Sequence, residues 1–380
     1  MSKSSGKTAF LIGWFGRKNV GDDLLFLNAL EQLKKSGVSQ ITVYAEYVDA
    51  LPRYDEILVV KQFKGLFRGH ILLKQLITIC RNDILVFGGG SMFSDNDMTR
   101  ALGLKYKSAF TFIAKCLRKK IFAMGCGVGP IKSAKGKKLT RKIFRRFTFV
   151  QVRDEESRQL LIRNGIEAQR ISKSFDPAIS IASKAFPIKG QDTGNRERLG
   201  LGISFSSSPG TEQYSNNDVL KVLAESINKI SYINSSVSIT VYLIQMCGNG
   251  RFNDLALREK FSAYLNEGIT IQCIRYTNDT KAFLAQIYEL DALVSERLHT
   301  SILAFAMRIP FLVIPYHTKC LDFISSVNYE GSTNQLSIDS FLLTVLHNNG
   351  SKLFGASVEL DTIRYAIKES DRSLRHAILC

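Results

Sequence analysis

The chain has 380 residues, which is long for one hydrophobic core and sufficient for two domains. Hydrophobic residues make up 45% and charged residues 22% of the chain, a composition that excludes a disordered protein. Lys and Arg number 51 against 34 Asp and Glu, so the net charge is +17 and we expect an anionic partner: nucleic acid, phospholipid headgroups or phosphorylated metabolites.

The seven cysteines are scattered without a CxxC pair, which argues against a structural zinc site or a disulfide framework and favours a reducing compartment. The first residues, MSKSSGKTAFLIGWFG, lack the apolar run of a signal peptide, and charged residues interrupt the longest apolar stretches. We therefore expect a cytoplasmic protein with no metal and no cofactor. Any contact with a membrane would be peripheral and on its inner face.

Short strands alternate with helix-length segments along the first half of the chain. The predicted strands are TAFLIGWF, ITVYAE, EILVV, DILVFGGG, IFAMGCG and FTFVQVR, and the predicted helices cover residues 22–36, 70–80 and 98–117. Apolar strands with helical crossovers indicate a parallel sheet that is covered on both faces.

The pattern lapses in the polar segment 183–200 and then restarts. The later predicted strands are LGISFS, SITVYLIQ, ITIQCI, ALVSE and FLVIP, with helices over 217–230, from Asn253, from Thr280 and after Ser295. The sequence thus predicts an α/β protein of two Rossmann-like domains, residues 1–185 and 200–358, and a last helix in 359–380 that could belong to either. In such sheets ligands bind beyond the carboxyl ends of the strands, so we expect the site in a cleft between the domains.

The first strand-to-helix junction, GWFGRKNVGDDLL, places Asp22 and Asp23 at the start of a helix. It resembles a dinucleotide fingerprint only loosely, since GxGxxG is absent and the two acids would repel a phosphate. The junction is either an N-cap with acidic first-turn residues or a place where Asp22 accepts hydrogen bonds from sugar hydroxyls.

Two further junctions are rich in glycine. Gly88, Gly89, Gly90 and Ser91 follow an apolar strand, so successive N–H groups and a hydroxyl could form an anion-binding nest; the alternative is a tight turn. In GCGVGP, we interpret Cys126 as a small buried residue and not as a nucleophile.

The fourth junction, VQVRDEES, places Arg153 and Asp154 at the start of a helix. Asp154 is a suitable N-cap, whereas the cation of Arg153 opposes the helix dipole and suggests an external anion. A pairing of Arg153 with Asp154 or Glu156 is the alternative.

The stretch SERLHTSILAFAMRIPFLVIPYHTK places Arg297 and His299 between a strand and a helix. No acidic residue follows Glu296 until Asp322, so the sequence shows no local counter-ion for this arginine. This arrangement favours a ligand site, although both residues could simply separate a buried strand from a buried helix.

Together with SFDPAIS, these elements resemble the polysaccharide pyruvyl transferase family over about residues 10–316, and the R-L-H sequence is their most specific part. The resemblance implies a fold similar to GT-B, with two Rossmann-like domains facing a cleft. It also implies transfer of the pyruvyl group of phosphoenolpyruvate to two hydroxyls of a sugar in a cell-surface or exopolysaccharide precursor. The product would be a cyclic ketal, and phosphate would be released.

The resemblance associates Arg297 and His299 with phosphoenolpyruvate and makes Arg153 a second anion ligand. A histidine that titrates near neutrality can move protons, and Asp22 or Asp176 could orient or deprotonate the acceptor hydroxyl. The other residues that we predict to bind substrate are Asn19, Gly89, Gly90, Ser91 and Thr300.

The alternative function is a GT-B glycosyltransferase that uses a nucleotide sugar. Such enzymes commonly bind the donor ribose with a glutamate shortly after the equivalent helix start, and the acid-free run after Arg297 argues against it.

The segment KSAKGKKLTRKIFRRF, residues 132–147, spaces apolar residues at helical intervals among many cations. It predicts an amphipathic basic helix, which is either solvated or in peripheral contact with an anionic membrane. The predicted partners are phosphoenolpyruvate and a sugar or lipid-linked oligosaccharide acceptor, and not nucleic acid.

Overall fold

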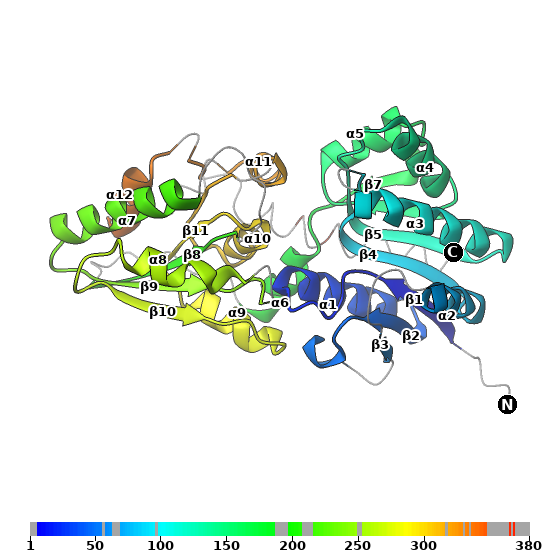
Figure 1. Ribbon diagram of the computed structural model, residues 1–380, viewed down its shortest axis with the longest axis horizontal. Helices are drawn as coiled ribbons and strands as arrows, with labels where there is room; N and C mark the ends of the chain where they lie inside the picture. Colours follow the sequence, from blue (N-terminus) through cyan, green and yellow to red (C-terminus); the bar gives the residue numbers. More distant parts are fainter. Residues whose placement is uncertain are drawn as a thin grey trace. The chain divides into compact units, whose positions relative to one another are not determined.

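The structure is a computed structural model that describes residues 6–54, 58–62, 69–95, 98–186, 197–206, 216–248, 253–315, 318–329, 331–333, 336–347, 365 and 368. The chain divides into two compact units (Figure 1). The first unit comprises Met1–Arg17, Asp22–Pro177 and Tyr365–Cys380, and the second comprises Lys18–Gly21 and Ala178–Arg364.

The first unit is built on a parallel sheet with the strand order β3-β2-β1-β4-β5-β6-β7. Its strands are β1 (Lys7–Ile12), β2 (Val38–Ala45), β3 (Leu58–Gln62), β4 (Ile84–Phe93), β5 (Lys120–Val128), β6 (Phe149–Val152) and β7 (Ile171–Lys173). This is the doubly wound order, and the direction of winding reverses between β1 and β4. The predicted parallel sheet is confirmed, and β7 is a strand that the sequence analysis missed.

Helices cover both faces of this sheet. They are α1 (Val20–Lys35), α2 (Gly69–Arg81), α3 (Met98–Cys116), α4 (Ala134–Phe144) and α5 (Glu155–Arg163), with the 3-10 turns η1 (Val48–Ala50) and η2 (Ala168–Arg170). Phe26, Leu30 and Leu33 of α1 pack into one apolar core, whereas α2 to α5 contribute to the core on the other face. The spacing of three and four residues on α1 is the helical period that places these side chains on one side.

The glycine-rich segments continue their strands, as the predicted strands DILVFGGG and IFAMGCG indicate, and the alternative of a tight turn after β4 is not observed. Gly88–Ser91 lies inside β4, and the pairing of β4 with β5 becomes irregular between Gly90 and Phe93. Gly89 and Gly90 have φ values of 69° and 72°, which non-glycine residues rarely adopt. An irregularity of this kind bends a strand and changes the direction of the side chains that follow it.

The second unit has a parallel sheet with the order β10-β9-β8-β11-β12, and its winding reverses between β8 and β11. Its strands are β8 (Arg198–Ser204), β9 (Ser238–Ile244), β10 (Thr270–Ile274), β11 (Ala292–Ser295) and β12 (Phe311–Val313). Its helices are α6 (Ala178–Ala185), α7 (Asn216–Ile233), η4 (Asp254–Leu257), α8 (Arg258–Ser262), α9 (Thr280–Tyr288), α10 (Leu298–Met307), α11 (Thr318–Ser326) and α12 (Ile338–Leu346). None of the helices in the described part of the chain is both long and apolar enough to span a membrane.

The division of the chain differs from the predicted boundaries in two places. Helix α6 belongs to the second unit because it packs against α10, so the first unit ends at Pro177 and not at residue 185. The short segment Lys18–Gly21 also belongs to the second unit. Most of the predicted helix in 359–380 lies outside the described residues, and only Tyr365 and Lys368 are described.

One lysine lies on the core-facing side of α3. Lys107 stands three residues after buried Leu104 and three before buried Phe110, and its ammonium lies 5.7 Å from the ring centroid of Phe93. Burial lowers the pKa of Lys107 to about 8, and the nearby thiol of Cys126 opposes this shift. The folded state therefore carries an unfavourably placed charge at neutral pH.

We expect Lys107→Met to stabilise the first unit at pH 7 by about 2 kcal/mol, because it removes a desolvated charge and keeps the apolar stem. The unfolded chain binds the lysine proton up to a pKa near 10.4, whereas the folded chain loses it near pH 8. The stability of the wild type should therefore rise between these two values, and the advantage of the variant should shrink. Thermal melting at pH 7 and pH 9.5 measures both effects.

Lys105→Met is the matched control, since Lys105 is exposed on the same helix. It should change the melting temperature little at either pH. If Lys107→Met melts at or below the wild-type temperature at pH 7, burial of the Lys107 ammonium does not destabilise the folded state.

Candidate functional site

Arg297 lies at the point where the winding of the second sheet reverses. Strand β11 ends at Ser295, Arg297 is the N-cap residue of α10, and the backbone N–H of Glu296 donates to the carbonyl of Ser204 on β8 at 2.9 Å. Helix α10 is buried along its whole apolar length, so its N-terminus is rigidly placed. The predicted strand–helix junction is confirmed, and it lies where doubly wound sheets bind ligands.

The expectation that Arg297 has no local counter-ion is wrong. Its guanidinium forms an ion pair with Asp254, the first residue of η4. The side chain of Asp254 is completely buried, and its second carboxylate oxygen accepts the N–H of Cys247 at 2.8 Å. Asp254 is more than forty residues away in sequence, and the fold alone brings the two together.

A second carboxylate, that of Glu296, lies beside this pair. It accepts the backbone N–H of Ser206 at 2.6 Å and is 6% exposed. Burial raises the pKa of Glu296; the Ser206 hydrogen bond and the charge of Arg297 oppose the rise, whereas the charge of Asp254 adds to it. Glu296 is thus closer to neutrality than a solvated glutamate.

His299 lies against the segment Lys18–Gly21. A Cβ on Gly21 would overlap the imidazole ring, so the close approach of ring and backbone requires glycine at this position. The segment is fixed by hydrogen bonds to the loop after β9: Val20 N–H donates to the carbonyl of Met246, and Gly248 N–H donates to the carbonyl of Lys18, both at 2.9 Å. Its place beside His299 is therefore set by backbone bonding.

Asn19 and Thr300 belong to the same network. The Oδ1 atom of Asn19 accepts the N–H of Gly21 at 3.0 Å, and Asn19 forms an isolated antiparallel bridge with Cys247. The hydroxyl of Thr300 donates to the hydroxyl of Ser204 at 2.9 Å, which ties the first turn of α10 to the end of β8. The predicted residues Asn19, Arg297, His299 and Thr300 are thus brought together within the second unit.

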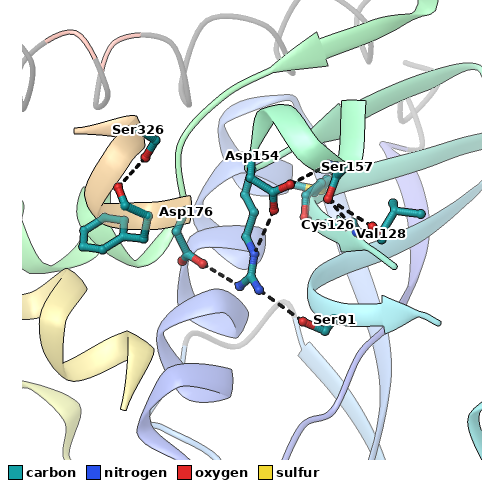
Figure 2. A network of polar contacts seen from close by, with 10 residues as sticks. Ser91, Cys126, Val128, Asp154, Ser157, Asp176 and Ser326 are labelled. Carbon is teal, nitrogen blue, oxygen red and sulfur yellow. Dashed lines mark hydrogen bonds and ion pairs between the residues drawn. The ribbon is translucent and has the colours of Figure 1, made fainter. Parts of the chain in front are cut away.

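The first unit holds a separate polar network around Arg153 (Figure 2). Nη1 of Arg153 donates to Asp176 at 2.7 Å, Nη2 donates to the hydroxyl of Ser91 at 3.1 Å, and Nε lies 3.7 Å from Asp154. The Arg153 and Asp176 side chains are 8% and 4% exposed. Of the two pairings considered from the sequence, the one with Asp154 is present; the nearer partner, Asp176, was not considered as a counter-ion.

Burial and neighbouring charges shift the pKa values of two groups in this network. Burial lowers the pKa of Arg153, but the charges of Asp176 and Asp154 outweigh it and raise the pKa above its ordinary value. Burial also raises the pKa of the Cys126 thiol to about 12, so this cysteine is a buried thiol, as predicted. Asp154 caps α5 by accepting the N–H of Ser157 at 2.7 Å, which confirms its predicted role.

Asp22 lies in the first turn of α1, and its Oδ1 would be 3.8 Å from a Cβ placed on Gly90. The structure thus places the carboxylate of Asp22 near the glycines of β4. Asp22, Gly89, Gly90, Ser91, Arg153 and Asp176 all belong to the first unit. The predicted site residues therefore form two groups, one in each unit.

Asp254 is the site residue that the sequence analysis missed. The available signal was the segment CGNGRFND, a glycine-containing junction between β9 and a helix, in a position equivalent to the junctions that were considered. In the described part of the chain no group of three His, Cys, Asp or Glu side chains is arranged to hold a metal ion.

Comparisons with known proteins show relatives in fold. The structure is similar to the UDP-GlcNAc 2-epimerase from Methanocaldococcus jannaschii, with a TM-score of 0.63, 14% identity and coverage of 97% of this chain and 99% of that one. A putative UDP-N-acetylglucosamine 2-epimerase from Listeria monocytogenes gives a TM-score of 0.58 at 14% identity and covers 95% of each chain. UDP-GlcNAc 2-epimerase from Neisseria meningitidis, bound to UDP-GlcNAc, gives 0.54 at 11% identity, with coverage of 98% and 95%.

At these identities the likeness shows the GT-B-like fold alone, and no curated protein matches the sequence. The family model of the polysaccharide pyruvyl transferases, however, matches residues 19–318, and this range includes both groups of site residues. The chain belongs to the polysaccharide pyruvyl transferase family.

Proposed function

We propose that this pyruvyl transferase takes the pyruvyl group from phosphoenolpyruvate and joins it to two hydroxyls of one sugar as a cyclic ketal, releasing phosphate. The acceptor is a sugar or lipid-linked oligosaccharide, a precursor of a cell-surface polysaccharide or exopolysaccharide. The observation that carries the proposal is the arrangement of Arg297 and His299 at the reversal point of the second sheet, with Arg297 oriented by buried Asp254.

The second unit has features that favour the binding of an anion such as phosphoenolpyruvate. An arginine offers a planar fork of donors that matches a carboxylate or a phosphate, and the N-terminus of α10 adds further N–H donors with a favourable dipole. Asp254 limits the motion of the guanidinium, which reduces the entropy lost when a ligand binds.

The reaction needs one proton delivered and two removed. Protonation of the methylene carbon of phosphoenolpyruvate gives an oxocarbenium-like carbon, which the first sugar hydroxyl attacks with loss of its proton. Departure of phosphate regenerates such a carbon, and the second hydroxyl attacks it and loses a proton in turn. One released proton balances the proton taken up by carbon, and the other leaves with the phosphate. The proposal assigns these proton transfers to His299, whose ring lies against Gly21.

The first unit is proposed to bind the acceptor. Asp22 beside Gly90 can accept a hydrogen bond from a sugar hydroxyl and remove its proton. Asp176 is engaged by Arg153 at 2.7 Å, so its proposed part is to orient that arginine. Arg153 and Ser91 then provide donors for acceptor oxygens or for an anionic group, and Gly89 and Gly90 leave room for the ligand beside the backbone.

Phosphoenolpyruvate should raise the melting temperature of the protein, by mass action on the folded state. Arg297→Lys should weaken the binding by roughly tenfold or more, because lysine keeps the charge and loses the fork. Arg275→Lys is the control, since Arg275 is exposed on the same unit. Stabilisation by UDP- or GDP-sugars, with none by phosphoenolpyruvate, would replace this proposal with a nucleotide-sugar glycosyltransferase.

His299→Gln should leave the thermal shift by phosphoenolpyruvate largely intact. Turnover, followed as phosphate release with a panel of sugar acceptors, should fall by roughly two to four orders of magnitude, the usual contribution of a general acid or base. A folded His299→Gln variant with wild-type turnover would reduce His299 to a positioning residue.

Asp22→Asn and Asp176→Asn should have different effects. Asp22→Asn should lose turnover and lower the melting temperature less than Asp176→Asn does, because Asp22 is only partly buried. Asp176→Asn should lower the melting temperature, because removal of one partner of a buried ion pair is destabilising by about 3–5 kcal/mol. Equal melting temperatures for the two variants would contradict the role given to Asp176.

A further inference from the structure

The net positive charge of the protein comes from one segment of the first unit. Residues 98–153 contain sixteen Lys or Arg and no Asp or Glu. Since the whole chain has 51 basic and 34 acidic residues, the remainder is almost neutral, with 35 basic and 34 acidic residues. An excess confined to one segment indicates a particular surface, because a charge that served solubility alone would be spread over the chain.

Helix α4 presents these cations on its outer side. The exposed basic residues on it and at its two ends are Lys132, Lys135, Lys137, Lys138, Arg141, Lys142 and Arg145. The inner side of the same helix buries Ile143 and Phe144, and Phe147 follows in the core. The packing of these three side chains therefore fixes which side of α4 is cationic.

Exposed apolar side chains lie on the neighbouring helices. Phe112 of α3 is 54% exposed and Leu117 just after it is 43% exposed, while Leu73 and Ile77 of α2 are 60% and 42% exposed. Helix α2 packs against α3, and α3 lies beside α4 (Figure 1). The guanidinium of Arg146 lies 5.2 Å from the ring centroid of Phe112, so the apolar and basic regions adjoin.

We propose that this basic–apolar face, formed by the exposed cations of α4 with Leu73, Ile77, Phe112 and Leu117, binds the surface of an anionic lipid bilayer. Lysine and arginine would contact the headgroups, and the apolar side chains would enter the boundary of the acyl chains. Nucleic acid would use the same cations, but it offers no apolar phase to aliphatic Leu73, Ile77 and Leu117.

Acidic residues near this face are outnumbered by its cations; Asp95 lies at the start of α4, where it accepts the N–H groups of Lys132 and Ser133 at 2.6 and 2.9 Å. The neighbouring helix α5 carries Glu155 and Glu156 in its first turn. Glu155 is engaged by Arg158 and Gln159 on its own helix, at 3.1 and 2.6 Å. Membrane binding by this face would depend on exposed charged and apolar side chains, so it can be tested independently of the transfer reaction.

Flotation of the full-length protein with vesicles tests the proposal. We expect recovery with phosphatidylcholine vesicles that contain phosphatidylglycerol, none with phosphatidylcholine alone, and loss of binding at high salt. The triple variant Lys138→Gln, Arg141→Gln, Lys142→Gln should lower the partition coefficient by roughly one to two orders of magnitude. The control triple Lys221→Gln, Arg258→Gln, Lys281→Gln removes the same types of exposed charge from the second unit and should bind as the wild type does.

A second pair of variants tests the apolar part. Phe112→Ser with Leu117→Ser should lower the partition coefficient several-fold at unchanged charge, whereas Ile233→Ser, which removes a 58% exposed aliphatic side chain from α7, should not. Melting curves establish that each variant is folded before it is used.

Equal recovery with neutral and anionic vesicles, or equal losses in the test and control triples, would overturn the proposal. So would binding to a homopolymeric RNA that displaces the vesicles and does not respond to Phe112→Ser with Leu117→Ser. That outcome would assign the face to nucleic acid.

Discussion

The buried carboxylate of Asp254 connects three segments on which the site of the second unit depends. It pairs with Arg297 at the start of α10 and accepts the N–H of Cys247 from the loop after β9. Neighbours of Cys247 in that loop hold the segment Lys18–Gly21 by backbone hydrogen bonds, and this segment places Gly21 against His299. Loss of the carboxylate would leave a mostly buried guanidinium without its ion-pair partner, so the positions of the arginine and the histidine are physically coupled.

The first unit also orients an arginine by pairing it with a carboxylate that is distant in sequence. Arg153 directly follows β6, Arg297 lies two residues after the end of β11, and each lies just before a helix, where a cation is unfavourable on its own. A carboxylate from a different part of the chain pairs with each of them: Asp176 with Arg153 and Asp254 with Arg297. Both guanidinium groups are therefore oriented before any ligand arrives. In the proposed function, their contribution to anion binding would come from this orientation and not from an uncompensated charge.

The sequence predicted what depends on local pattern. Apolar strands and amphipathic helices have recognisable periods, so both parallel sheets and the junctions of Arg153 and Arg297 were identified. It could not predict pairings between distant residues, such as Arg297 with Asp254, since nothing local marks the partner. The predicted strand DILVFGGG ended too early, and a tight turn was considered for Gly88–Ser91, because the sequence does not show that the pairing of β4 with β5 continues to Phe93. Lys107 could have been noticed as a charged residue at a core-facing helical position.

The fold of this protein and the side chains of its site give different information about the ligand. Structural neighbours such as UDP-GlcNAc 2-epimerase from Methanocaldococcus jannaschii share the fold at 14% identity, and a doubly wound sheet of the kind found in this chain has a reversal point suited to many ligands. The architecture alone therefore does not choose between a nucleotide sugar and phosphoenolpyruvate. The choice depends on side chains at the second reversal point: a pre-oriented arginine, a histidine held against backbone, and a buried glutamate with a raised pKa. Under the proposed function this combination would bind a small dianion and move its protons, which is why the proposal favours the smaller donor.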